Sequence, residues 1–128
     1  MRQFIVNPLV GFDNVQFGMS REEVRSILGS PLREFKKSKY SKTTTDDFGV
    51  FHLFYDETDK FEAVEFFEEA GLKDIKGNTF PKEIAADVPF PYALDNEGND
   101  YINAEYSIGI FAPNNRIESI LFGIKGYY

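Results

Sequence analysis

The sequence contains no cysteine and a single histidine, and these scarcities exclude several kinds of chemistry. Without cysteine the chain can form no disulfide, no thiol nucleophile and no zinc site built on thiolates. It suits a reducing compartment, and we expect it in the cytoplasm. His52 lies among aromatic residues, without a serine or cysteine nucleophile motif. This context favours a structural or interface role for His52 over a catalytic one.

Long apolar runs and glycine-rich loops are also missing. No stretch approaches the roughly 20 apolar residues that a membrane span needs, and residues 1–10 are too short for the apolar core of a signal peptide. Gly11, Gly18 and Gly29 are too dispersed to form a phosphate-binding loop. We therefore expect no membrane association, no nucleotide and no other cofactor.

What the chain does have is aromatic mass and acidic charge. Its 128 residues suit one domain, residues 1–128, and 14 Phe and 7 Tyr supply material for a core. Residues 1–42 carry eight Lys or Arg against four Asp or Glu, +4, whereas residues 43–128 carry six against seventeen, −11. An acidic surface repels phosphate backbones, so nucleic acid is not an expected partner. The basic stretch 33–42 is interpreted as a solvated loop.

One short helix is strongly specified by its ends. Ser20 and Glu23 have the spacing of a capping box, in which each side chain binds the backbone N–H of the other. Gly29 supplies a left-handed C-terminal residue, and Pro31 forbids continuation. We expect a helix of about two turns that ends at Leu28.

Apolar runs separated by polar turns predict two β-hairpins. The first would join 48–55 to 61–67, and the second would join 106–112 to 117–124. A third strand is expected near 72–75, and 77–101 is predicted to be mostly loop, with a helical turn after Pro81 through Ala85. The resulting fold class is α+β, with helices on one face of an antiparallel sheet. The order of elements also suggests two divergent repeats, 12–69 and 72–128.

Carboxylates are the remaining candidates for chemistry. Those between Asp56 and Glu69 could supply an acid and a base, but turns and solvent faces are normally charged, so we predict no catalytic residue. Residues 95–100 offer oxygen ligands, yet Gly98 is fourth and Tyr106 stands at position twelve, unlike a calcium loop. We interpret them as an acidic turn and expect no metal site.

The stretch 15–31, with Gly18-Met19-Ser20, Val24 and Leu28-Gly29 before Pro31, resembles the opening helix of BamE-like (SmpA/OmlA) domains. That family pairs small helices with an antiparallel sheet, and the β-lactamase inhibitor protein is similar to a duplicated version. The resemblance implies protein binding without catalysis. The sequence departs from both in its lack of cysteines. Its small size and acidity are also similar to those of many bacterial immunity proteins.

These observations lead to two hypotheses. The first is a non-catalytic protein-binding module, an immunity or inhibitor protein that neutralises a bacterial toxin or enzyme and binds a basic partner. The second is a small-molecule or ion-binding protein or enzyme that uses the carboxylates from Asp56 to Glu69. For the first hypothesis, the predicted partner-binding residues are Asp56, Glu57, Asp59, Glu62, Glu65, Tyr127 and Tyr128.

Overall fold

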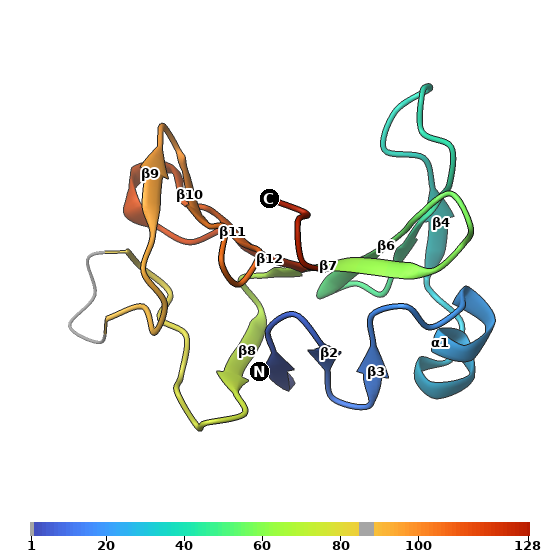
Figure 1. Cartoon of the computed structure of the whole chain (residues 1–128), viewed down its shortest axis with the longest axis horizontal. Helices are drawn as coiled ribbons and strands as arrows, with labels where there is room; N and C mark the ends of the chain where they lie inside the picture. Colours follow the sequence, from blue (N-terminus) through green and yellow to red (C-terminus); the bar gives the residue numbers. More distant parts are fainter. Residues whose placement is uncertain (1, 85–88) are drawn as a thin grey trace.

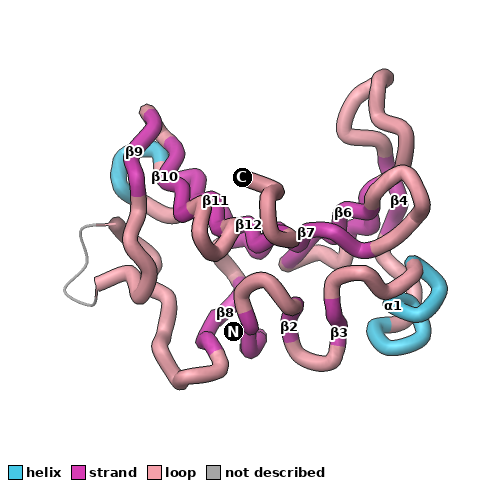
Figure 2. The backbone as a smooth tube through the Cα atoms, in the orientation of Figure 1, coloured by secondary structure: helices cyan, strands magenta, loops and turns pink. Residues whose placement is uncertain are grey.

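The computed structural model describes residues 2–84 and 89–128, and strands dominate it. Strands and isolated β-bridges make up 44% of the described residues and helices 9%, and strands and loops fill most of the trace in Figure 2. The described residues contain one α-helix, α1 (Arg21–Leu28), and one short 3₁₀ turn, η1 (Pro113–Asn115). The α+β prediction is therefore wrong, and the fold is mainly β. The prediction failed because a second sheet, rather than a layer of helices, covers the core face of the main sheet.

An eight-stranded antiparallel sheet forms the larger layer. Its strand order is β4-β5-β6-β7-β12-β11-β10-β9, so two four-stranded meanders meet where β7 pairs with β12. The strands are β4 (Arg33–Phe35), β5 (Thr45–Asp47), β6 (Phe51–Tyr55), β7 (Phe61–Phe67), β9 (Asp95–Glu97), β10 (Asp100–Asn103), β11 (Ile108–Phe111) and β12 (Ser119–Gly123). Along the sheet, the strands of the first meander stand in chain order, β4 to β7, and those of the second stand in reverse chain order, β12 to β9. Descent of residues 12–69 and 72–128 from one repeat stays a prediction.

A four-stranded sheet forms the smaller layer, with the order β3-β2-β1-β8. Its strands are β1 (Arg2–Asn7), β2 (Gly11–Phe12), β3 (Val15–Gln16) and β8 (Ala70–Asp74). The first three form an antiparallel meander, whereas β1 and β8 pair in parallel. Strand β8 corresponds to the strand expected near 72–75. Its parallel partner, β1, lies more than 60 residues earlier in the sequence.

Phenylalanine side chains fill the space between the two sheets. Phe4 of β1 and Phe12 of β2 have ring centroids 5.1 and 5.2 Å from that of Phe66 in β7. Both rings also lie 5.3 Å from Phe51 of β6. These four side chains are at most 2% exposed, and each buried aromatic removes about 150–250 Å² from water. In Figure 1 the small sheet lies beneath β7 and β12, where this aromatic core holds it.

Both predicted hairpins are present. Strands β6 and β7 pair antiparallel across the polar turn at 56–60, where Asp59 adopts a left-handed backbone with φ 64°. Strands β11 and β12 pair across η1, where Asn114 and Asn115 have φ of 57° and 66°. Asparagine tolerates this backbone region better than most residues. Local turn chemistry therefore set the register of both hairpins.

Helix α1 also follows its local sequence. The Ser20 side chain accepts the Glu23 backbone N–H at 3.1 Å, and Glu23 Oε1 accepts the Ser20 N–H at 3.3 Å, which completes the capping box. Gly29 ends the helix with φ 87°. Val24 is fully buried, whereas Ile27, one turn further along, is 44% exposed. A helix of this length presents only a narrow buried stripe to the sheet.

Residues 77–101 contain more structure than the expected loop. Asp95–Glu97 and Asp100–Asn103 form the β9–β10 hairpin across Gly98 and Asn99, so the acidic turn is the tip of a hairpin. Glu83 forms an isolated β-bridge with Arg116 instead of a helical turn. Ala85, the end of the predicted helical turn, lies outside the described residues.

Candidate functional site

The large sheet is curved, and its hollow side carries the candidate site. Strands β9 and β10 rise at one end and the β4–β5 loop, residues 36–44, rises at the other (Figure 1). The C-terminus lies between these two rims. We call this surface the concave face; the opposite face packs on the small sheet.

One row of paired residues crosses the concave face through all eight strands. Successive cross-strand pairs link Arg33, Asp47, His52, Glu65, Leu121, Gly109, Ile102 and Asp95. Directly paired residues point their side chains to the same side of a sheet. The row is charged at both ends and contains apolar residues and glycine between β10 and β12.

Two glycines of this face make room for the C-terminal tyrosines. A Cβ at Gly109 would overlap the hydroxyl of Tyr128, and a Cβ at Gly123 would lie 2.6 Å from Cβ of Tyr127. The left-handed backbone of Gly126, φ 86°, accompanies the return of the chain onto the sheet. The two tyrosine rings pack edge to face with centroids 5.6 Å apart. The tyrosines therefore rest on the sheet, with Tyr128 still 39% exposed.

A cavity of about 250 Å³ lies beside the Tyr128 ring. Ile102, Phe111 and Leu121 give it apolar walls, and Glu65 and Asp100 bring a carboxylate from β7 and another from β10. Phe111 is directly paired with Asp100 across the strands and is 40% exposed. The cavity therefore combines exposed apolar surface with negative charge.

The charge of these two carboxylates reaches the tyrosine hydroxyl. Burial, followed by the neighbouring Tyr127 and the charges of Glu65 and Asp100, raises the pKa of Tyr128 to about 12. Within residues 2–84 and 89–128, no Lys, Arg or His nitrogen lies within 4.0 Å of either carboxylate. Their negative charge is consequently open to an added ligand.

His52 is held on the same face by aromatic rings and a carboxylate. Its ring centroid lies 4.7 Å from Phe67 and 5.3 Å from Phe35. Its Nε2 is 3.4 Å from Oδ1 of Asp47, which Arg33 binds at 2.9 Å. These contacts hold the imidazole at the sheet surface, and the structural or interface role of His52 stays a prediction.

A wider hollow of about 480 Å³ lies between the β4–β5 loop and β7. Lys37 of this loop stacks over Phe54, with Nζ 3.6 Å from the ring centroid. Glu62 faces the same hollow at an irregularity in the pairing, where Phe54 opposes Ala63 and Tyr55 opposes Phe61. Burial, followed by the charge of Asp56, raises the pKa of Glu62. This hollow therefore has both acidic and basic side chains in its lining, whereas the cavity near Tyr128 has acidic ones.

The three predicted residues of the β6–β7 turn have distinct local roles. Asp56 Oδ1 accepts hydrogen bonds from the backbone N–H groups of Thr58, at 2.8 Å, and Lys60, at 3.0 Å. Asp59 receives the Arg21 guanidinium at 2.8 Å. Glu57 makes an exposed ion pair with Lys42 at 2.9 Å. Asp56 and Asp59 therefore hold the turn and the helix in place.

The structure divides the seven predicted residues between two areas. Glu62, Glu65, Tyr127 and Tyr128 gather on the concave face, and Asp56, Glu57 and Asp59 lie at the β6–β7 turn, where Asp56 and Glu57 line the same hollow as Glu62. Sequence reasoning missed Asp100 and Phe111, which pair across β10 and β11. Asp100 was assigned to a polar loop, and only the apolar alternation of β11 could have indicated the direction of Phe111.

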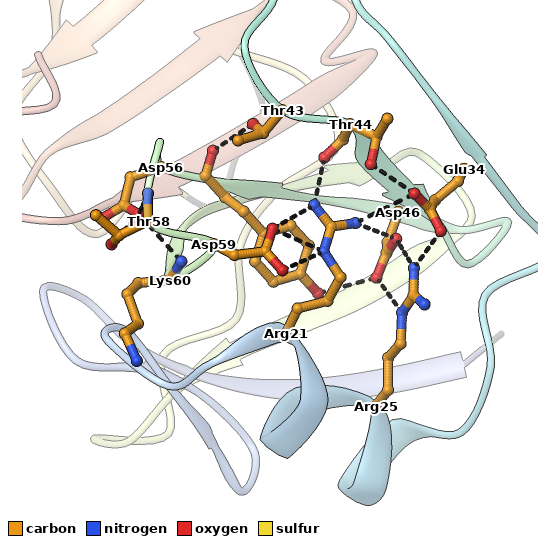
Figure 3. A network of polar contacts seen from close by, with 11 residues as sticks. Arg21, Arg25, Glu34, Thr43, Thr44, Asp46, Asp56, Thr58, Asp59 and Lys60 are labelled. Atoms are coloured by element: carbon orange, nitrogen blue, oxygen red, sulfur yellow. Dashed lines mark hydrogen bonds and ion pairs between the residues drawn. The ribbon is translucent and has the colours of Figure 1, made fainter.

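Sequence reasoning also missed a buried charge network that joins α1 to the large sheet (Figure 3). Asp46 of β5 has a fully buried side chain and receives Arg21 at 2.8 Å and Arg25 at 2.6 Å. Glu34 binds Arg25 from its exposed side at 2.8 Å. The hydrogen bonds that Arg25 donates to Asp46 raise the pKa of Arg25, and the hydrogen bond that Arg25 donates to Glu34 lowers the pKa of Glu34.

The network satisfies its buried groups with protein partners. Tyr55 donates its hydroxyl to Asp46, and its ring lies under the Arg21 guanidinium, 4.0 Å from the guanidinium carbon. Burial, followed by the charge of Asp46, raises the pKa of Tyr55. No side-chain nitrogen or oxygen that is buried in the described residues lacks a hydrogen-bond partner. We therefore assign this network to the fold and the concave face to the candidate site.

In the part of the chain that the structure describes, no group of three or more His, Cys, Asp or Glu residues is placed to hold a metal ion. Within that part, no helix has the length and apolar character to cross a membrane.

Comparison with known proteins does not place the chain in a family: no family model, no curated protein and no solved structure matches it. The resemblance to BamE-like domains and to the β-lactamase inhibitor protein stays a prediction.

Proposed function

We propose that the chain is a non-catalytic protein-binding module that acts in the cytoplasm and captures a basic protein partner on its concave face. In its specific form, the proposal is an immunity or inhibitor protein that neutralises a bacterial toxin or enzyme. The observation that carries it is the cavity beside Tyr128, where exposed aromatic and apolar groups adjoin the carboxylates of Glu65 and Asp100.

Two physical arguments favour a protein over a smaller ligand. The face is broad and spans eight strands, and protein interfaces combine aromatic anchors with polar surroundings. Its carboxylates belong to the acidic part of the chain, residues 43–128 with charge −11, which would steer a basic partner toward the surface.

The alternative, a small-molecule or ion-binding site between Asp56 and Glu69, has one feature in its favour, because Asp56, Glu57 and Glu62 line the hollow of about 480 Å³. Lys37 and Lys42 line the same hollow, and Lys42 already pairs with Glu57 at 2.9 Å. Asp56 binds backbone N–H groups within its own turn, whereas Glu65 faces the Tyr128 cavity. Glu68 binds Arg116 at 2.9 Å, elsewhere on the molecule. The carboxylates of this segment are thus divided between the hollow near Lys37, the Tyr128 cavity and the pair with Arg116.

Affinity capture from the producing cells tests the proposal. The tag belongs at the N-terminus, because Tyr128 lies on the concave face. We expect a stoichiometric basic partner whose association slows as salt increases, since salt screens long-range attraction. Phe111→Ala should weaken capture, whereas Ile75→Ala, an exposed apolar residue after β8, should not.

The immunity or inhibitor role needs a second measurement on the captured partner. Its enzymatic or toxic activity should fall in the presence of the wild-type chain and recover with Phe111→Ala. Absence of a partner at low and high salt, or equal loss of capture in the Phe111 and Ile75 variants, would reject the proposal. Capture of a partner with unchanged activity would reject the inhibitor role alone.

A further inference from the structure

The cavity beside Tyr128 has the size of a site for one side chain. Its volume of about 250 Å³ is below the ~300–1,000 Å³ typical of pockets for drug-sized ligands. Gly109 contributes no Cβ to its floor. A single long side chain, inserted from a partner on the concave face, matches this depression better than a cofactor or a metabolite does.

The lining selects the chemistry of that side chain. Ile102 and Leu121 can pack against an aliphatic stem, and such stems bury readily while their charged heads remain paired. Glu65 and Asp100 provide carboxylates on two sides. A cationic group at the end of an aliphatic stem can pair with both carboxylates. An anionic group would be repelled, and an apolar group would desolvate the carboxylates without giving them a partner.

Two features favour arginine over lysine. Its planar guanidinium can donate hydrogen bonds to two carboxylates at once in a fixed fork geometry. A lysine ammonium is a compact point charge and lacks this fork. The ring of Tyr128 forms part of the cavity wall and offers an aromatic face for cation–π stacking. The same pairing occurs within this chain, where the Arg21 guanidinium lies 4.0 Å from the centroid of Tyr55.

The chain's own cations leave the position open. Lys37 interacts with the charge of Glu65, but its ammonium sits over Phe54, 3.6 Å from the ring centroid. Within residues 2–84 and 89–128, neither Glu65 nor Asp100 forms an ion pair shorter than 4.0 Å. We propose that this cavity receives an arginine side chain of the protein partner, an inference that rests on the proposed function.

A peptide probe tests the cavity without knowledge of the partner. Acetyl-Gly-Arg-Gly-amide is titrated into the full chain, and backbone amide shifts are followed by NMR. We expect saturable shifts centred on Gly109, Leu121 and Tyr128, with weaker binding of the matching lysine peptide. The citrulline peptide has nearly the same shape without the charge, and it should not bind.

Charge-neutralising variants locate the site. Glu65→Gln and Asp100→Asn should each weaken arginine-peptide binding about tenfold, as expected for loss of a charge-assisted hydrogen bond. Glu22→Gln, on α1 away from the cavity, makes the same change in net charge and should bind like wild type. Amide spectra of the unliganded variants check that each one is folded.

Three results would overturn the inference: no saturable shift, equal binding of the citrulline peptide, or equal affinities of the Glu65, Asp100 and Glu22 variants. These results are separable from those of affinity capture. A partner captured through Phe111 without arginine-peptide binding would retain the proposed function and reject the arginine site. Peptide binding without a partner would retain the site and reject the function.

Discussion

The hydroxyl of Tyr55 lies 3.0 Å from Oδ2 of Asp46, a carboxylate with no exposed side-chain surface. Arg21 and Arg25 of α1 bind the same carboxylate. One buried charge therefore connects the helix to β5 and β6. Removal of one partner from such a group costs much more than the net gain from the intact group, because the remaining charges stay desolvated.

Asp46→Asn should lower the free energy of unfolding by about 3–5 kcal/mol, the usual cost of breaking a buried ion pair. The measurement is chemical denaturation of the purified protein. Glu57→Gln is the matched control, because its ion pair with Lys42 has both side chains about 70% exposed, and such pairs contribute about 1 kcal/mol or less. A loss below about 1 kcal/mol for Asp46→Asn would contradict the role assigned to the network.

Gly109→Ala should displace the C-terminal tyrosines, because the added Cβ overlaps the Tyr128 hydroxyl. We expect a cost of about 1–3 kcal/mol in the full chain, typical of overpacking. In a chain that ends at Gly126 the same substitution should cost almost nothing, since Tyr128 is no longer there. Equal costs in both backgrounds would show that Tyr128 does not rest on Gly109.

Ser20→Ala should destabilise the protein by about 1 kcal/mol through loss of the N-cap of α1. Ser26→Ala is the control from the same helix, because its hydroxyl donates to the carbonyl oxygen of Glu23 and caps no free N–H. Thermal unfolding of both variants would measure the difference. If the two substitutions had equal effects, the capping box would not be stabilising the helix.

Asp56→Asn should change the response of stability to acid. Hydrogen bonds from the backbone of Lys60 and from the Thr58 side chain hold the pKa of Asp56 below its usual value. A lowered folded pKa contributes stability above the unfolded pKa, and this contribution is lost as pH falls through the folded value. The wild-type chain should therefore be the more stable at neutral pH, and the gap should narrow below about pH 4.

Denaturation of both chains at a series of pH values would measure this gap. A difference that stays constant from neutral pH to well below about pH 4 would show that the Asp56 carboxylate is not the stabilising species.

Local sequence patterns predicted the elements whose partners are near in the chain. The capping pair Ser20 and Glu23 gave helix α1, and the turns before Phe61 and after Phe111 gave the two hairpins. The fold class was wrong because a second sheet covers the core face, and its strands β2 and β3, of two residues each, resemble loops, as do the short polar strands β4, β5 and β9 of the large sheet. Such strands gain their stability from pairing in the sheet, which no single stretch of sequence displays.

Only part of the candidate site was predicted, because long-range strand pairing brings some of its residues together. Glu65 and Tyr128 were selected as an exposed charge and an aromatic anchor, and both line the cavity. Asp100 was missed because it reaches the cavity only through the pairing of β10 with β11 and β12 with β7. The buried position of Asp46 also depends on tertiary contacts, which make an acidic residue in a polar segment part of the interior.

The parallel pairing of β1 with β8 constrains the order in which the molecule can be assembled. Arg2 pairs with Ala70 and Val6 with Asp74, so this edge of β1 stays unpaired until more than half of the chain has left the ribosome. Closing so long a loop is slow compared with forming a hairpin. During synthesis Phe4 must therefore wait for Phe51 and Phe66, and an apolar strand near the N-terminus stays exposed to chaperones or to other nascent chains.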